Sequence, residues 1–371
     1  RTAACKRIAT VTIFFLLALC TWVAWDNWGR FLHTSELSTS QASDRPALEV
    51  LARGEYLTRI GGCMACHTAK GGEPLAGGRR IDTPFGAVFS SNLTSSQTHG
   101  LGQWTEADFE NALHWGRSRD GHLLLPVFPY NHTSVFTRDD VRAIFSWLQT
   151  IKPIEQAQAP HRLTWPLGTQ PVIAVWRSLF FTPTPFKPKD SESATWNRGA
   201  YLVQSAGHCA ACHGQRNVLG SFPAVDDLSG GFLSPQMWFA PNLLDASQTT
   251  MAHSSLDDIT NLLRIGQSRS AQTSGPMAEF VQHTGQYLSQ ADSLAIATYL
   301  TSKIQAPEPA KKPTAAVLAA SSPSTETLYA NHCATCHGKS GEGQTNVYPT
   351  LAGNPAVVLA SPENLIQMVL Y

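Results

Sequence analysis

The chain has 371 residues, and its 27 Lys and Arg balance 27 Asp and Glu, so its formal net charge is zero. A neutral chain lacks the overall basic field of a nucleic-acid-binding protein, and we expect no nucleic-acid partner. Hydrophobic residues make up 43% of the chain, which is enough for packed cores and excludes a disordered polypeptide. Eight cysteines are too few for a disulfide-dense scaffold of this length, so their placement is the informative feature.

The first apolar stretch, residues 8–25, is typical of a membrane-spanning helix. It carries no charged residue, and its length lies near the lower end of the roughly 17–25 residues that such helices need. Basic residues precede it: Arg1, Lys6 and Arg7. Because positive charge tends to stay in the cytoplasm, we expect a single N-terminal anchor in the bacterial inner (cytoplasmic) membrane, with the rest of the chain on the periplasmic side.

A cleaved signal peptide is the competing interpretation, and it would release a soluble periplasmic shuttle. Cleavage needs small residues after the apolar run, whereas this run ends in the bulky sequence TWVAWDNWGR. A lipoprotein site at Cys20 would follow Leu19, which is too large for the usual pattern. We therefore expect the anchor to be retained in the lipid, with Cys5 and Cys20 as small apolar residues.

The other six cysteines form three copies of the sequence C-x-x-C-H. In this motif two thiols in one helical turn add to the vinyl groups of one haem, and the next His supplies the proximal imidazole of the iron. The pattern predicts three covalently bound haem c groups. The predicted attachment residues are Cys63, Cys66, Cys209, Cys212, Cys333 and Cys336, and the predicted proximal ligands are His67, His213 and His337.

Zinc and thiol redox chemistry are the other known uses of paired cysteines. A zinc site needs four ligands from paired half-sites, whereas each pair here stands alone in the sequence. A redox pair of the thioredoxin type does not require His after the second Cys in every copy. Three C-x-x-C-H motifs in an exported chain therefore favour haem attachment.

The surroundings of the motifs also repeat, which indicates three small helical domains. GEYLTRIGGCMACH from Gly54 matches GAYLVQSAGHCAACH from Gly199, and amphipathic closing helices with N-caps at Thr137 and Ser289 follow. The only candidate for extended structure is PFGAVFSSNL, as a short strand or a loop. We expect a mainly α fold of three tandem cytochrome c-type domains behind one transmembrane helix. The expected boundaries are 1–45 for the anchor and stalk, 46–151 for haem domain 1, 152–195 for a Pro-rich packed connector, 196–304 for haem domain 2, 305–323 for a flexible linker, and 324–371 for haem domain 3, apparently incomplete at its end.

The distal ligand of each iron has to come from elsewhere in its domain. For the second haem we expect Met277, which lies on a Gly-Pro loop ahead of the closing helix. For the third haem we expect the ligand beyond Tyr371, because Met368 falls inside an apparent helix.

The first haem has no such methionine. Met64 lies inside the attachment loop, and Phe128 stands where a Met would be expected. His132, His122 or no protein group at all remain as the alternatives for this iron.

Taken together, several segments resemble the three-haem cytochrome c subunits of membrane-bound bacterial dehydrogenases. The resemblance extends over nearly everything from Gly54 to Tyr371. The segments that carry it are GGCMACHTAKGGEPLAGGRRIDTPFGAVFSSNLT, SRDGHLLLPVFPY, NRGAYLVQSAGHCAACHG, GPMAEFV and HCATCHGKSGEGQTNVYPTLAGN. It implies a subunit that takes electrons from a catalytic partner oxidising alcohols, aldehydes or sugar acids and delivers them to ubiquinone. Such partners hold pyrroloquinoline quinone, flavin, or a molybdenum cofactor (molybdopterin) with iron–sulfur clusters.

Two departures from the alcohol dehydrogenase version bear on the partner. That version usually has Met in place of Phe128 and lacks a clear retained anchor. The sequences PVFPY and AVWRSLFF are more similar to the subunit of the molybdenum-containing aldehyde dehydrogenases, which we therefore expect as the partner.

The chain carries no P-loop, G-x-G-x-x-G fingerprint or H-E-x-x-H sequence. We expect an electron-transfer subunit rather than the substrate-oxidising one. The alternatives are the same role beside a quinoprotein alcohol dehydrogenase or a flavin sugar-acid dehydrogenase, and a peroxidase-like haem enzyme with an open first iron.

Overall fold

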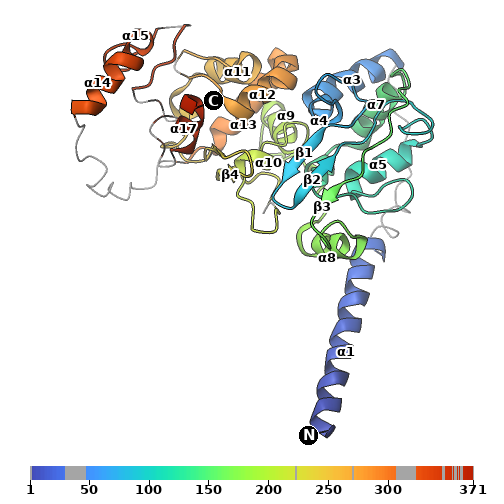
Figure 1. The fold of residues 1–371 in the computed structure, drawn as a ribbon. Coiled ribbons are helices and arrows are strands. Elements are labelled where there is room, and N and C mark those ends of the chain that lie inside the picture. Colours follow the sequence, from blue (N-terminus) through green and yellow to red (C-terminus); the bar gives the residue numbers. More distant parts are fainter. Residues whose placement is uncertain are drawn as a thin grey trace. The chain divides into compact units, whose positions relative to one another are not determined.

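The computed structural model describes most of the chain (Figure 1). The described residues are 2–29, 47–221, 224–269, 271–305, 323–344, 347–352, 354, 357, 359 and 362–370. The expected stalk at 30–45 and residues 306–322 of the expected linker lie outside them, as does Tyr371. The chain divides into two compact units, unit 1 with Arg1–Glu55 and His67–Pro185, and unit 2 with Tyr56–Cys66 and Phe186–Tyr371.

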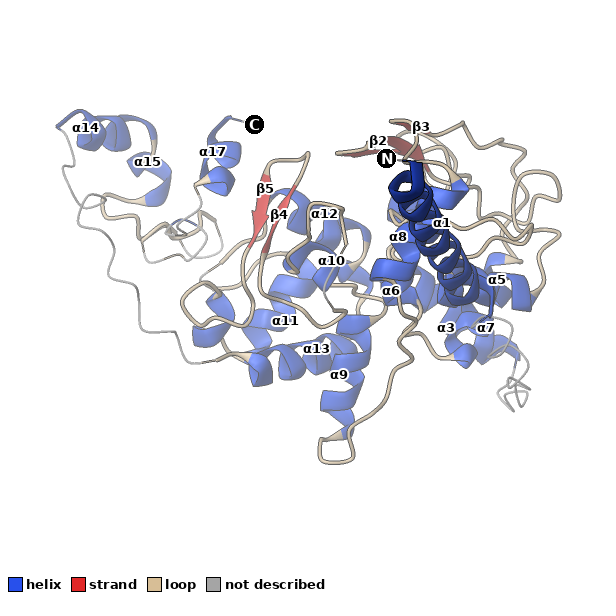
Figure 2. Cartoon of the chain, turned by 90° about the horizontal axis from the view of Figure 1, so that it is seen from below, coloured by secondary structure: helices blue, strands red, loops and turns tan. Residues whose placement is uncertain are grey.

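The prediction of a mainly helical chain is confirmed, since about 48% of the residues are in helices (Figure 2). The elements up to residue 185 are α1 (Thr2–Ala24), the π-helical turn η1 (Trp25–Gly29), α3 (Ala47–Ile60), α4 (Cys63–His67), β1 (Arg80–Thr83), β2 (Gly86–Phe89), α5 (Glu106–Trp115), α6 (Tyr130–Thr133), α7 (Arg138–Leu148), β3 (Arg162–Leu163) and α8 (Gln170–Phe180). Those that follow are α9 (Ala194–Gln204), α10 (Ala210–His213), β4 (Gly231–Leu233), β5 (Trp238–Ala240), η2 (Thr250–His253), α11 (Leu256–Ile265), α12 (Gly275–His283), η3 (Gly285–Tyr287), α13 (Gln290–Lys303), α14 (Pro323–His332), α15 (Ala334–His337) and α17 (Glu363–Leu370).

Both expected closing helices begin at the predicted N-caps. Thr137 accepts a side-chain hydrogen bond from the backbone N–H of Asp140 at the start of α7, and Ser289 accepts one from Asp292 at the start of α13. These bonds satisfy backbone donors that the first turn of a helix leaves free. The local sequence therefore fixes where each closing helix starts.

A glycine lets a second helix cross each closing helix closely. A Cβ on Gly54 of α3 would lie 1.9 Å from the carbonyl oxygen of Ala143 in α7, and one on Gly199 of α9 would lie 2.0 Å from that of Ala295 in α13. Only a residue without a side chain permits these approaches. The same crossing therefore recurs in unit 1 and in unit 2.

An arginine beside each of these glycines pairs with an aspartate at the start of the closing helix. In unit 1, Arg53 pairs with Asp140, whose side chain is 1% exposed. In unit 2, Arg198 donates two hydrogen bonds to Asp292, at 2.8 Å and 2.7 Å. A paired and hydrogen-bonded carboxylate can be buried where a lone one cannot.

Five short strands accompany the helices in the described part of the chain. The candidate stretch PFGAVFSSNL supplies β2, which pairs antiparallel with β1 and with β3. The antiparallel pair of β4 and β5 in unit 2 was not expected from the sequence. Each of these strands has two to four residues, too few for an alternating pattern to stand out.

Among the described residues, one helix is long and apolar enough to cross a membrane, over Thr10–Gly29. Its far end is joined to unit 1 by Asn27, which is only 4% exposed. The Nδ2 group of Asn27 donates to the carbonyl oxygens of Val23 (2.9 Å) and Ala174 (3.0 Å) and to Ser178 Oγ (2.8 Å), while Arg177 Nε donates to Asn27 Oδ1 (3.0 Å). Because a buried amide is costly unless its hydrogen bonds are made, these bonds hold the end of α1 against α8.

Candidate haem sites

Each C-x-x-C-H sequence folds as one short turn of helix. The first motif makes up α4, while in the other two the first cysteine lies directly before α10 or α15. All six motif cysteines are free thiols, so none is used in a disulfide. Two free thiols in one turn followed by an imidazole are the donor set that haem c attachment requires. The residues at all three motifs therefore fit the group that the sequence predicts.

The imidazole of each motif is oriented by a hydrogen bond to a backbone carbonyl. His67 Nδ1 donates to the oxygen of Ser91 (2.7 Å), and His213 Nδ1 donates to that of Pro241 (2.9 Å). The third copy is the same, with His337 Nδ1 donating to the oxygen of Pro349 (2.9 Å). A proton held on Nδ1 leaves the lone pair on Nε2, which is how a metal-ligating histidine is normally fixed.

A second backbone bond closes the loop after each motif. The N–H groups of Gly77, Gly230 and Gly343 donate to the carbonyl oxygens of the three motif histidines, at 2.7, 2.6 and 2.7 Å. These glycines have φ of +79°, +87° and +69°, a conformation that side chains disfavour. The loop geometry is therefore built on glycine in all three copies.

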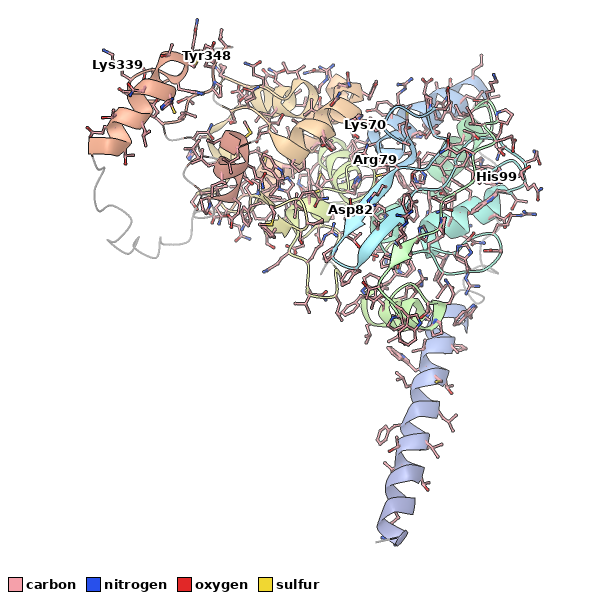
Figure 3. The ribbon with its side chains drawn as sticks, in the orientation of Figure 1. Lys70, Arg79, Asp82, His99, Lys339 and Tyr348 are labelled. Atoms are coloured by element: carbon pink, nitrogen blue, oxygen red, sulfur yellow. The ribbon has the colours of Figure 1, made fainter. Side chains whose placement is uncertain are left out.

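In the first two copies a short hairpin presents the accepting carbonyl. Strand β2 ends at Phe89, two residues before Ser91, and β5 ends at Ala240, directly before Pro241. The small β-sheets therefore position the groups that orient His67 and His213. Figure 3 shows the third copy, where Tyr348 lies beside α15 and its ring centroid is 6.1 Å from that of His337.

Burial sets the protonation state of the histidine and of the first cysteine in the first two motifs. It lowers the pKa of His67 and of His213 below the ordinary value, so both imidazoles are neutral, as a metal ligand must be. It also raises the pKa of the Cys63 and Cys209 thiols to about 12. These thiols are thus kept uncharged.

The first two motifs lie close together through residues that both belong to unit 2. A Cβ on Gly62, directly before Cys63, would lie 3.7 Å from Cε1 of His208, directly before Cys209. Burial raises the pKa of Cys212, the nearby Arg216 guanidinium lowers it in part, and the nearby Cys66 thiol raises it again. These cysteines of the first two motifs, all in unit 2, therefore share one neighbourhood.

Met277, the expected ligand of the second haem, lies in the first turn of α12 and is partly buried. A backbone hydrogen bond closes the loop that precedes it. The N–H of Thr273 donates to the carbonyl oxygen of Gly266, the glycine that ends α11 (2.8 Å). Met277 follows Thr273 by four positions.

Unit 1 repeats this arrangement with another residue at the end. The N–H of Leu124 donates to the carbonyl oxygen of Gly116, which ends α5 (2.8 Å). Phe128 follows Leu124 by four positions, so it occupies in unit 1 the position that Met277 occupies in unit 2.

The two candidate histidines of unit 1 differ in environment. The side chain of His122 is 48% exposed and its Nδ1 lies 2.5 Å from the carboxylate of Asp120. His132 lies on α6, four positions after Phe128 in the chain, and is completely buried. Met368 of the last helix is 57% exposed.

Comparison with known proteins gives one family. A cytochrome c family model matches residues 325–369. The cytochrome c subunit of the quinone alcohol dehydrogenase of Gluconacetobacter polyoxogenes is 35% identical over 86% of this chain and 72% of its own length. The fructose dehydrogenase cytochrome subunit of Gluconobacter japonicus is 33% identical over 90% of this chain and 72% of its own. The gluconate 2-dehydrogenase cytochrome c subunit of Pantoea cypripedii is 33% identical over 91% and 80%.

The carbonyl that orients His67 gives a direct test of the loop geometry. A Cβ at Gly77 would lie 2.6 Å from the Ser91 oxygen, whereas one at Gly71, which has nearly the same φ of +72°, would meet nothing within 4 Å. We expect Gly77→Ala to lower the free energy of unfolding by about 1–3 kcal/mol more than Gly71→Ala, because only Gly77→Ala adds a steric clash to the backbone strain. Urea unfolding of both variants measures the difference, and equal losses would contradict the assigned contact.

Proposed function

Because the chain belongs to the cytochrome c subunits of dehydrogenase complexes, we propose that it carries three haem c groups and relays electrons from a catalytic dehydrogenase subunit to ubiquinone. One observation carries this proposal. Two free thiols, a histidine with Nδ1 on a carbonyl, and a glycine N–H on the histidine carbonyl recur together at all three motifs. When bound, haem supplies a one-electron redox centre at each of them.

The residues of this chain would hold each porphyrin and tune it. The six cysteines would form thioethers, and His67, His213 and His337 would be the proximal ligands. The neighbourhood shared by Cys66 and Cys212 supports a short path between the first and second haems. Substrate has no need to reach this subunit, because electrons alone pass through it.

For the distal side we propose Met277 at the second haem and His132 at the first. Phe128 has no atom that can bind iron, and His132 is the completely buried histidine of the segment that follows it. His122 is supported less well, since it is exposed and already paired with Asp120. A His–His first haem would have a lower potential than a His–Met second haem, because thioether ligation raises the potential.

Carbon monoxide binding to the reduced protein tests these ligands. Removing a distal ligand opens one iron, so Met277→Ala and His132→Ala should each add about one haem equivalent of CO-reactive iron to that of the wild type. His122→Ala is the matched control and should add none. Haem content, measured alongside, identifies any variant that fails to assemble. A gain in His122→Ala, or a wild-type first haem that already binds CO, would contradict the assignment and favour the open, peroxidase-like alternative.

We further propose a retained anchor in the inner membrane, with the haem domains on the periplasmic side. The buried amide of Asn27 supports retention, since cleavage near residue 30 would remove Asn27 and leave Arg177 and the carbonyl of Ala174 without this partner. For the partner, the segments around Phe128 and AVWRSLFF favour a molybdenum-containing aldehyde dehydrogenase, whereas the relatives named above serve alcohol, fructose and gluconate dehydrogenases.

Purification of the intact complex tests the function as a whole. We expect a companion subunit with molybdopterin and iron–sulfur clusters, whose substrate reduces the haems and whose electrons a soluble ubiquinone analogue then removes. A quinoprotein or flavoprotein companion would contradict the aldehyde dehydrogenase assignment while leaving the relay intact. Oxidation of the substrate by the isolated chain would contradict the relay itself.

A further inference from the structure

The outward side of α8 is apolar although no described part of the chain covers it. Val175 and Leu179 lie one turn apart on this helix and are 37% and 56% exposed. The turn before the helix exposes Trp165 (84%) and Leu167 (38%). Single exposed apolar residues are ordinary, but a group on one element indicates a binding surface.

The inward side of α8 packs against the end of α1. Ile173 and Ala174 are buried together with Val23 of α1 and with Leu123. The Asn27 hydrogen bonds join the same two helices. Figure 1 shows α8 lying at the end of α1, and both helices belong to unit 1. The exposed side of α8 therefore lies at the level where α1 leaves the membrane, if α1 crosses one.

The single charged residue of α8 is turned away from that exposed side. Arg177 is 4% exposed and donates to the carbonyl oxygens of Trp115 (2.6 Å) and Gly116 (3.4 Å) as well as to Asn27. Its guanidinium also lies over the rings of Tyr130 and Phe181, at 5.0 Å and 4.7 Å from the centroids. Because the guanidinium of Arg177 is buried and hydrogen-bonded, the outward side of α8 carries no charged side chain of that helix.

Tryptophans lie at the same level in α1 and in the π-helical turn η1 that follows it. Trp22 near the far end of α1 is 42% exposed, and Trp25 and Trp28 of η1 are 64% and 40% exposed. Tryptophan favours the boundary between lipid headgroups and acyl chains, where its ring is partly apolar and its N–H stays hydrated. Trp165 adds a ring from the turn before α8.

We propose that α8 and the turn at Trp165–Leu167 form a second membrane contact, lying in the interface of the bilayer that α1 crosses. The partner is a lipid surface, which receives Trp165, Val175 and Leu179. This inference rests on the proposed anchor and goes beyond it, because an anchor alone does not set the tilt of α1 in the bilayer, nor that of unit 1 with it. Two contacts joined by Asn27 and Arg177 fix the orientation of unit 1 to the membrane.

Depth-dependent quenching tests this contact on the full haem-loaded chain. Cys5 and Cys20 are first replaced by Ala, so that with the motif thiols in thioethers a new Cys is the one free thiol. Leu179→Cys is labelled with an environment-sensitive fluorophore and reconstituted in phosphatidylcholine–phosphatidylglycerol vesicles containing nitroxide lipid. We expect about twofold or stronger quenching by nitroxides placed about 5–10 Å below the headgroups.

Leu48→Cys on α3 is the matched control, because Leu48 is 81% exposed and Figure 1 shows α3 at the end of unit 1 away from α8. Its label should stay unquenched. Alkaline carbonate extraction of the same vesicles separates the two claims. A chain retained after extraction with an unquenched Leu179 label would overturn the second contact and leave the anchor intact. Release by carbonate would overturn the anchor and, with it, the contact.

Discussion

The structure depends on one repeated constraint, which is that an imidazole must be held with its Nδ1 proton on a backbone carbonyl directly after two free thiols. His67, His213 and His337 all satisfy it, at 2.7–2.9 Å. The nearby elements follow from it: a glycine with positive φ returns the loop to each histidine, and in two copies a hairpin delivers the accepting carbonyl. The close helix crossings at Gly54 and Gly199 pack the helices that lead into the first two motifs against the closing helices.

A second buried polar group links the haem-bearing fold to its attachment. Asn27 ends the apolar helix with its amide fully engaged, and Arg177 completes the connection from within α8. Such groups are favourable only when all their hydrogen bonds are made, so they specify one arrangement of α1 and α8. The proposed relay to a membrane quinone would need a defined height above the membrane, and this connection would supply a physical basis for it.

Much of this arrangement was predictable because its signals are local in the sequence. The three motifs, the caps at Thr137 and Ser289 and the apolar helix follow from side-chain types at short spacings. The carbonyls of Ser91, Pro241 and Pro349 were not predictable, since any residue offers a carbonyl and only the fold brings it to the imidazole. The burial of Asn27 likewise depends on α8, almost 150 positions away in the chain. The short strands β4 and β5 have too few residues for a pattern to show.

The number of covalently bound haems tests the central claim most directly. Pyridine haemochrome and iron analysis of the purified chain, after denaturation and extraction with acidic organic solvent, should give three haems that stay with the polypeptide. Replacing both cysteines of any one motif by Ala should remove one of the three. Fewer than three irons per chain, or pigment that passes into the solvent, would contradict the relay proposed for these three sites.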